Sequence, residues 1–140
     1  MTLSRTIERV ANGVEPQVWI ALRFVAGVMF AFHGAQKLFG LFGKATVEFG
    51  TQMWLGGVIE LVGGMLIAIG LFTRAAAFVS SGTMAVAYVQ FHWKLDAGDR
   101  FWPIVNRGEL AALYCFLFLF IAARGPGQYS IDGLIANRQR

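Results

Sequence analysis

Four long apolar stretches constrain the fold of this chain more than any other feature. They cover about residues 18–42, 53–72, 75–93 and 108–123, and polar or glycine-containing links separate them. A helix needs about 20 mainly apolar residues to cross the hydrocarbon core of a bilayer. Only 14% of the residues are charged, against about 25% in an average soluble domain. The sequence therefore predicts an all-α integral membrane protein, an antiparallel four-helix bundle that forms one domain over residues 1–140.

Two short helices are predicted outside the four spans. Residues 3–14 carry apolar side chains at helical spacing with charged residues between them, which is typical of a separate amphipathic helix on the membrane surface. Pro16 then introduces the first span. After the last span, the glycine and proline residues at 125–127 break the helix, and Ser130 begins a short tail helix.

The links between the spans differ in length. Gly70 and Thr73 frame a tight turn in which Thr73 is predicted to cap the third span, so that the second and third spans are antiparallel neighbours. The link from Lys94 to Asn106 is the longest and most polar. Its Phe101-Trp102-Pro103 stretch is either a lid at the membrane interface or a surface loop.

Composition excludes two classes of function. Cys115 is the single cysteine, so a thiol–disulfide exchanger with paired cysteines is excluded. The net charge of +4 arises from Lys and Arg residues scattered around the span ends, which does not indicate nucleic-acid binding. Seven of these cations fall on the side of the two termini and five on the other side, which favours cytoplasmic termini.

Most of the intramembrane polar residues fall in one half of the predicted bilayer. The first and third spans end on the face where the second and fourth begin, opposite the termini. Near that face lie His33, Lys37, Glu60, His92, Asn106, Arg107 and Glu109. A scattered set of polar residues would not share one depth, and intramembrane ionisable groups are functional candidates by default.

Glu60 is the most informative of these residues. It lies about two turns into the second span, on or beside a stripe of glycines that includes Gly56, Gly63 and Gly64, and small residues let membrane helices approach closely. His33 and Lys37 are four residues apart and therefore share one helix face. We expect Glu60 to face the bundle, within reach of His33 or Lys37.

Structural roles remain open for each of these residues. A Glu60 ion pair with Lys37 or His33 would fix the helix register, Lys37 alone would extend to the interface, and His92 would lie at the interface. Residues 106–109 resemble a capping box, which would account for Asn106 and Glu109 without chemistry. Arg23 and Arg74, toward the opposite face, are expected to be interfacial anchors.

Four segments, in order, resemble the DoxX family of small bacterial four-helix membrane proteins. They are RFVAGVMFAFHGAQKLFG, GGVIELVGGMLIAIGLFTRAAA, NRGELAALY and GPGQYSID, which together extend from Arg23 to Asp132. The resemblance implies a multi-pass protein of the bacterial inner membrane. It also implies a link to oxidoreductases, since relatives include subunits associated with a quinol oxidase and with thiosulfate:quinone oxidoreductase.

A quinone-reactive oxidoreductase, or a subunit of one, is the favoured function. Catalytic roles are predicted for His33 and Glu60 as proton donor and relay, for Lys37 as a stabilising charge and for Glu109 as a link to water. Predicted binding residues for ubiquinone or menaquinone are His33, Glu60, His92 and Asn106. No metal site is predicted, and a haem b held by His33 and His92 is a less favoured alternative.

Non-catalytic functions also fit the sequence. The chain would then be an accessory or assembly subunit of a larger membrane complex, or, as a weaker alternative, a carrier of small solutes or ions. The expected partners are the lipid bilayer and other subunits or further copies of the chain, with no nucleic acid among them.

Overall fold

The described part of the chain consists of helices and their connections. The computed structural model describes residues 3–139, and no β-strand occurs within that range. Within it, the α-helices are α1 (Leu3–Phe39), α2 (Gln52–Ile69), α3 (Thr73–Ala87), α4 (Pro103–Asn106), α5 (Glu109–Arg124) and α6 (Ile131–Arg138). Shorter turns are η1 (Leu41–Gly43), η2 (Tyr88–Trp93), which is π-helical and continues α3, and η3 (Asp99–Phe101). The predicted all-α class is confirmed.

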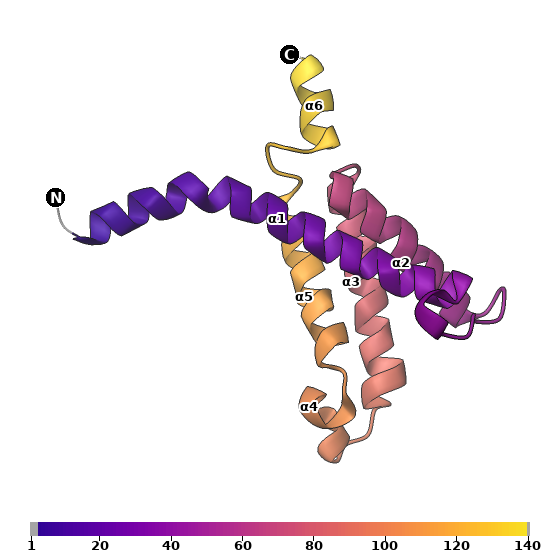
Figure 1. Ribbon diagram of the computed structural model, residues 1–140. Coiled ribbons are helices and arrows are strands. Elements are labelled where there is room, and N and C mark those ends of the chain that lie inside the picture. The colour runs from indigo at the N-terminus through magenta and orange to yellow at the C-terminus, as the bar shows by residue number, and fades with distance from the viewer. Residues whose placement is uncertain (1–2, 140) are drawn as a thin grey trace.

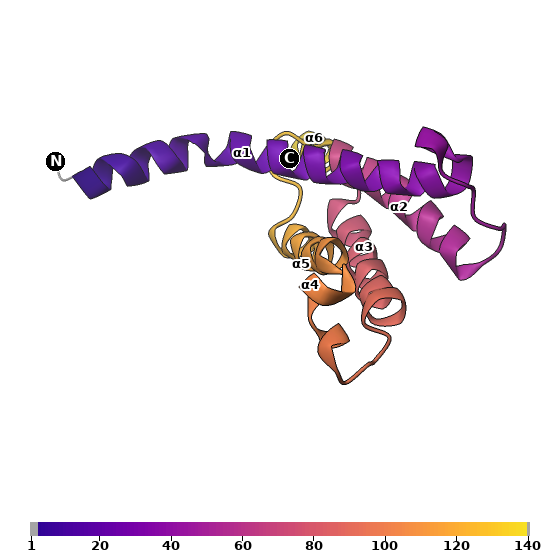
Figure 2. The same ribbon diagram turned by 60° about the horizontal axis from the view of Figure 1, so that its bottom comes forward.

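Helix α1 corrects the prediction of a separate N-terminal helix. It continues through Pro16 without interruption, because the carbonyl of Asn12 that loses its helical partner lies in an exposed segment where water can bond to it. Its 37 residues make it about 55 Å long. The N-terminal part projects away from the other helices (Figures 1 and 2).

The helices form two antiparallel pairs, α1 with α2 and α3 with α5 (Figure 1). Figures 1 and 2 show that α1 lies across the α3/α5 pair, while α2 runs in a direction between the two. The arrangement is therefore a crossing of two pairs rather than four helices in parallel alignment.

Glycines bring α1 and α2 into backbone contact. A Cβ atom on Gly34 would lie 2.5 Å from the carbonyl oxygen of Gly57, and one on Gly27 would lie 2.6 Å from that of Gly64. Any larger residue would force the helices apart, as at other close helix contacts in membranes. This contact fixes the register of α1 against α2.

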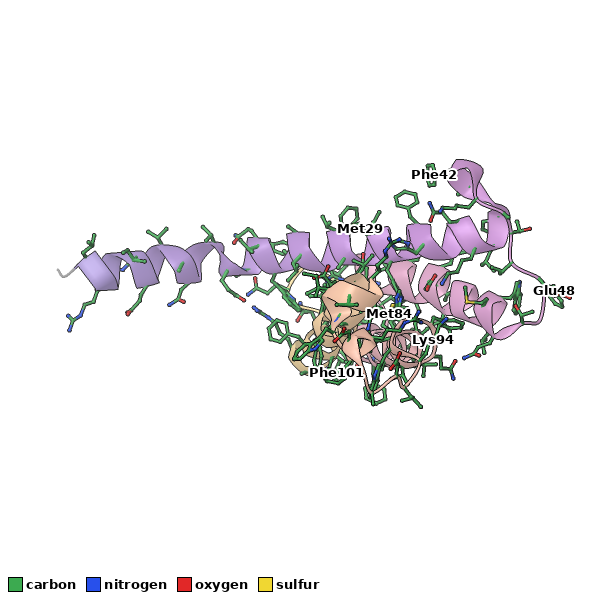
Figure 3. The ribbon with its side chains drawn as sticks, turned by 90° about the horizontal axis from the view of Figure 1, so that it is seen from below. Met29, Phe42, Glu48, Met84, Lys94 and Phe101 are labelled. Atoms are coloured by element: carbon green, nitrogen blue, oxygen red, sulfur yellow. The ribbon has the colours of Figure 1, made fainter. Side chains whose placement is uncertain are left out.

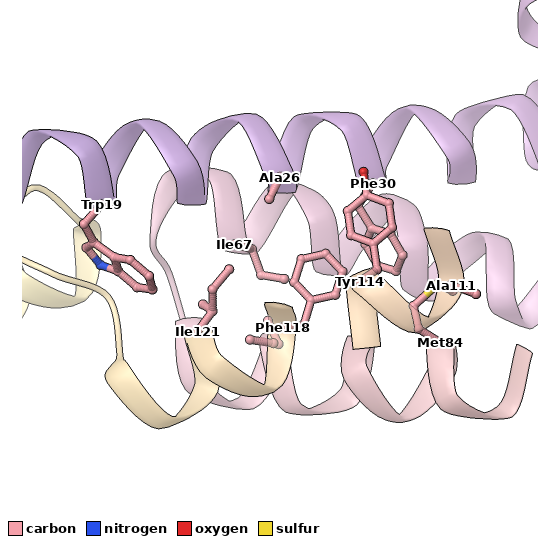
Figure 4. Close-up of a cluster of buried hydrophobic side chains, with 11 residues drawn as sticks. Trp19, Ala26, Phe30, Ile67, Met84, Ala111, Tyr114, Phe118 and Ile121 are labelled. Carbon is pink, nitrogen blue, oxygen red and sulfur yellow. The ribbon is translucent and has the colours of Figure 1, made fainter. Parts of the chain in front are cut away.

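An aromatic cluster joins α1 to α5 (Figure 4). The ring centroid of Phe30 lies 4.6 Å from that of Phe118 and 5.4 Å from that of Tyr114, within the range of favourable aromatic pairs. Ile67 from α2 and Ile121 from α5 complete the buried centre, both with no exposed surface. The core is thus shared by both helix pairs.

Arg23 is buried at the end of the fold near α6, which corrects its prediction as an interfacial anchor. Only 2% of Arg23 is exposed. Its Nη1 donates to the carbonyl of Ile67 at 2.9 Å, and its Nη2 donates to that of Tyr129 at 2.8 Å. Arg23 therefore connects α1, the end of α2 and the segment before α6.

Asp132 caps the start of α3. Its carboxylate accepts hydrogen bonds from the backbone N–H groups of Phe72 and Thr73, at 2.8 and 2.9 Å, and from the Thr73 hydroxyl at 2.8 Å. Thr73 is therefore not the cap that the sequence predicted. It lies inside the helix, and a residue from the C-terminal segment satisfies the free N–H groups of the first turn.

Other predicted helix ends are confirmed. Gly70 ends α2 in the left-handed region with φ 73°, and its N–H bonds to the carbonyl of Leu66 at 2.9 Å. Ser130 caps α6 by accepting the N–H of Gly133. Arg74 lies exposed but donates to the carbonyls of Ala122 and Ala123 at the end of α5.

Two described helices are long and apolar enough to cross a membrane. These are the part of α1 from Ile7 to Phe39 and the whole of α2, with mean hydropathy 1.6 in each. Helices α3 and α5 are shorter, with 15 and 16 residues. Only 39% and 33% of the two apolar windows are buried inside the protein, so most of their side chains face outward.

Candidate functional site

The centre of the candidate site is an ion pair between α1 and α2. Lys37 Nζ lies 2.5 Å from Glu60 Oε1, which confirms that Glu60 lies within reach of one of the two predicted residues on α1. The side chain of Glu60 is 4% exposed and that of Lys37 is 29% exposed. The pair is therefore buried at its acidic end and open at its basic end.

Glycine packing explains how the pair forms. A Cβ atom on Gly57 would lie 3.2 Å from Lys37 Cβ, so the lysine side chain begins directly against the backbone of α2. Glu60 lies one turn further along α2. Gly63 instead faces α3, where its Cβ would meet the hydroxyl of Ser80 at 2.6 Å.

The second carboxylate oxygen of Glu60 lacks a partner. Oε2 is buried and has no hydrogen-bond partner among residues 3–139. A buried acceptor without a donor costs about 1–3 kcal/mol, and more when it is charged. Unsatisfied buried groups are rare in folded proteins and are found at functional sites, so Oε2 is a candidate acceptor for a ligand or a proton.

Two pockets flank the ion pair. The first, here called the inner pocket, has a volume of about 220 Å³, and the second, here called the side groove, has a volume of about 540 Å³. Both are lined by Lys37, Glu60, Met84, Ala87 and His92. Figure 3 shows Met84 near the centre of the molecule, beneath α1. The buried ion pair thus forms a shared wall of two cavities.

The inner pocket gathers four of the predicted site residues, His33, Lys37, Glu60 and His92, with two groups that were not among them. His33 and Lys37 enter from α1, Glu60 from α2 and Arg107 and Tyr114 from the α5 side. His33 packs edge-on against the Tyr114 ring, with 6.4 Å between centroids. A pocket with a carboxylate, an imidazole and a phenol can donate and accept protons around one small ring.

His92 lies on the π-helical turn that continues α3. Its Nδ1 lies 3.2 Å from the backbone carbonyl of Asn106, and its ring stacks on Tyr88. Turns of this kind widen a helix locally and frequently occur at functional sites. His92 is half-buried and lines both cavities, rather than lying outside them at the surface.

The side chain of Asn106 is engaged in local structure. Its Nδ2 donates to Tyr88 Oη and to the carbonyl of Arg100, while its Oδ1 accepts the N–H of Gly108 at 2.7 Å. Asn106 is not among the residues that line either cavity. It holds the loop beside His92 instead.

Glu109 lies apart from the site. It is exposed, at the first position of α5, and does not line either cavity. The predicted capping box is wrong in its register, because α5 begins at Glu109 with Gly108 as its N-cap residue. The stretch Phe101 to Pro103, which joins η3 to α4, does not line either cavity, and Phe101 and Trp102 are exposed.

Tyr114 and Arg107 were missed as site residues from the sequence. Tyr114 is 5% exposed and lies in an otherwise apolar span, so a phenol at that position was a visible signal. Arg107 immediately follows the predicted Asn106. It lines the inner pocket, and its backbone lies in the left-handed region with φ 59°, a conformation that spacing in the sequence does not reveal.

The cavities set limits on bound groups. Within residues 3–139, no cluster of three or more His, Cys, Asp or Glu side chains is arranged to hold a metal ion. His33 and His92 both line the inner pocket. Its volume is below the range of about 300–1,000 Å³ typical of small-molecule sites, which suits one ring rather than the four linked pyrroles of a haem.

Comparison with known proteins gives several relatives. The chain is 41% identical over 115 residues to an uncharacterized protein of Haemophilus influenzae, with 79% of this chain and 85% of that protein covered. It is 30% identical over 146 residues to an uncharacterized membrane protein of Mycobacterium tuberculosis, covering 93% and 88% of the two chains. A Bacillus subtilis protein named "Putative oxidoreductase CatD" is 27% identical over 123 residues, covering 83% and 85%.

No solved structure matches the chain. The sequence profile described as DoxX matches residues 18–93. That match includes α2, α3 and four residues of the site, His33, Lys37, Glu60 and His92. With more than half of its length matched, this protein belongs to the DoxX family.

Proposed function

We propose that this DoxX family protein is a quinone-linked oxidoreductase of the bacterial inner membrane, or the quinone-binding subunit of one. The observation that carries the proposal is the buried carboxylate of Glu60, which has one oxygen on Lys37 and one with no partner in the described part of the chain. It lies between a ring-sized polar pocket and an apolar groove. This combination suits a ring ligand whose oxygen atoms take up and release protons.

The chemistry would use residues at comparable depth. Reduction of a quinone adds two electrons and two protons and gives the quinol, with the electrons supplied by a separate reductant. His33 would protonate one carbonyl oxygen and Glu60 would relay a proton to the other, while Lys37 would stabilise the anion that forms between the two steps. His92, with a face on both cavities, would exchange protons with water.

The proposal places the chain across the bilayer in four spans. Helices α1 and α2 are long enough, and α3 together with η2 extends from Thr73 to Trp93. The outer faces of α3 and α5 carry exposed apolar side chains such as Phe78, Val79, Leu113 and Phe116. Soluble proteins rarely expose large apolar patches to water, so the exposure of these side chains supports the four-span arrangement, in which lipid would cover them.

A binding titration tests the proposal. Protein in lipid nanodiscs is titrated with a short-chain ubiquinone analogue while the fluorescence of its four tryptophans is followed. Saturable binding in the wild type should weaken by about 10–100-fold in His33→Ala and Glu60→Gln, the loss expected for a hydrogen bond to a charged group.

Glu48→Gln is the matched control, because Glu48 lies exposed in the loop between α1 and α2. It should bind like the wild type. Equal affinity in wild type, His33→Ala and Glu60→Gln would exclude a quinone site at the ion pair.

A second candidate function is a non-catalytic subunit. It is favoured by the projecting N-terminal part of α1, whose exposed apolar side chains Leu3, Ile7, Val10 and Val14 share one face. Purification from native membranes tests it. Stoichiometric partner subunits together with an absence of quinone binding would favour this function over the first.

A further inference from the structure

Helices α2 and α3 separate from each other with distance from the turn that joins them. They meet at Gly70 and Phe72 and diverge toward the opposite end of the molecule (Figure 1). The side groove lies where they are apart. It therefore opens sideways, between two helices, rather than only toward one end of the molecule.

The lining of the side groove changes along its length. Most of its lining is apolar and includes Met53, Ile59, Val86 and Phe91, whereas Lys37, Glu60 and His92 line it where it adjoins the inner pocket. Gln52 and Thr83 also line it, and Gln52 Nε2 donates to Gln90 Oε1 at 2.5 Å between α2 and η2. Apolar side chains at the opening are partly exposed, including Met53 at 37% and Phe91 at 44%. A hydrocarbon chain in this groove would contact mainly apolar side chains, and a ring at the ion pair would contact charged ones.

The two cavities complement each other in size and chemistry. The inner pocket, at about 220 Å³, holds a polar ring but not a long substituent. The side groove, at about 540 Å³, is larger and is continuous with the ion pair that the ring would contact. The unpartnered Glu60 Oε2 is buried at the junction.

We propose that the side groove holds the hydrocarbon chain of a lipid-soluble ring ligand, which enters laterally between α2 and α3 and places its ring in the inner pocket. The inference rests on the proposed function and narrows its substrate to quinones with long isoprenoid chains. A water-soluble ring compound would leave the groove empty.

Two glycines keep the groove open. Gly56 on α2 and Gly82 on α3 both line it, and a Cβ atom on either would have nothing within 4 Å. This contrasts with Gly27 and Gly34, where a Cβ atom would collide with backbone. A leucine at Gly56 or Gly82 would therefore extend into the groove without disturbing the helix contacts, and it would also raise the intrinsic helix propensity.

The test compares two ubiquinones that share one ring, a short-chain analogue and one with a long isoprenoid chain, in nanodiscs. In Gly82→Leu and Gly56→Leu the long-chain compound should bind about tenfold more weakly or worse, because the new side chain occupies its path. The short-chain analogue should bind as it does to the wild type. The isoprenoid chain gains little free energy when it moves from lipid into an equally apolar groove. The experiment therefore detects whether the new side chain blocks the groove sterically.

Gly13→Leu is the control for a helical glycine substitution. Gly13 also has open space around it, but it lies on α1 and does not line the groove. Both quinones should bind to this variant as they do to the wild type.

Photolabelling identifies the path independently. A quinone with a photoreactive group on its chain should label peptides within 52–59 and 82–91. The rival site is an apolar groove of about 470 Å³ on the outer face of α1 and α2, lined by residues that include Phe24, Ala31 and Met65. Labelling there, or equal effects of Gly82→Leu on both quinones, would overturn the inference.

These outcomes separate the two proposals. In one outcome, short-chain binding depends on Glu60, but Gly56→Leu and Gly82→Leu bind the long-chain quinone as the wild type does. That outcome excludes the lateral path and leaves the proposed function intact. Absence of binding by either quinone overturns both.

Discussion

Each end of the α1/α2 pair holds a cation from α1 in a polar cluster, and the two cations have different roles: Arg23 is buried and Lys37 is partly exposed. Arg23 donates to two backbone carbonyls and lies near Asp132, so that its charge connects segments far apart in the chain. Lys37 binds one oxygen of Glu60, and the pair forms the wall of two cavities. Each cluster contains one buried polar atom without a partner among the described residues, Arg23 Nε in the first and Glu60 Oε2 in the second. Only the second lines cavities, so a buried charge is a functional candidate here because open volume lies beside it.

Removal of Arg23 should have the largest effect on stability. Arg23→Ala removes a donor from the carbonyls of Ile67 and Tyr129, of which Ile67 still accepts the N–H of Gly70, and creates a cavity. The expected loss in the free energy of unfolding is about 3–5 kcal/mol. Denaturant unfolding in detergent measures this loss. Arg74→Ala is the comparison, since the exposed Arg74 also donates to helix-end carbonyls. Equal losses in the two variants would contradict a special role for the buried arginine.

Changes at the Lys37–Glu60 pair should affect binding more than folding. Lys37→Met and Glu60→Gln should each weaken quinone binding by about 10–100-fold. Glu60→Gln should destabilise the fold less than Arg23→Ala, because Lys37 is partly exposed and can reach water without its partner. A double-mutant cycle with both readouts measures the coupling. Large loss of stability with unchanged binding would make the pair purely structural.

Asp132 should give a stability that depends on pH. Burial raises the pKa of Asp132, but hydrogen bonds from Thr73 and Phe72 and the charge of Arg23 outweigh it and hold the pKa below its ordinary value. Because the folded pKa is lowered, this stabilisation is present above about pH 4 and is lost as pH falls through the folded pKa. Thermal unfolding between about pH 6 and 2 should therefore show a decline that Asp132→Asn lacks.

The Asp132→Asn variant should also be about 1–2 kcal/mol less stable than the wild type at neutral pH, as for other lost helix caps. An identical pH profile in the two proteins would show that another carboxylate is responsible.

The smallest effect is expected for Glu109. It is exposed in the first turn of α5 and lies outside both cavities, so Glu109→Gln should cost only about 0.3–1 kcal/mol through the helix dipole. Quinone affinity, measured by the same fluorescence titration, should be unchanged. A tenfold loss of affinity would return Glu109 to the site.

Local patterns predicted the parts of the fold that depend on neighbours in the sequence. The spacing of His33 and Lys37 and the glycines around Glu60 indicated an ion pair between two helices, and it forms. Gly70 and Ser130 were recognised as helix ends from residue type alone. In each case the relevant partners lie on one helix or on two helices joined by a short connection.

Features that depend on distant contacts were missed. Asp132 caps α3 from 59 residues away, and no spacing rule connects the two. The crossing of α1 over the α3/α5 pair likewise depends on which side chains fill the centre, such as Phe30 against Phe118. Pro16 led to the prediction of an interruption in α1. The prediction failed because the segment around Pro16 is exposed, so that water can bond to the freed carbonyl, and this exposure is not visible in the sequence.

The contact between Asp132 and α3 also has a consequence for the order in which the molecule is completed during synthesis. Domains fold as their residues leave the ribosome, but the carboxylate that accepts the N–H of Phe72 belongs to Asp132, which is translated 60 residues later. The α2–α3 hairpin therefore emerges with an uncapped first turn, and only the arrival of α6 completes it.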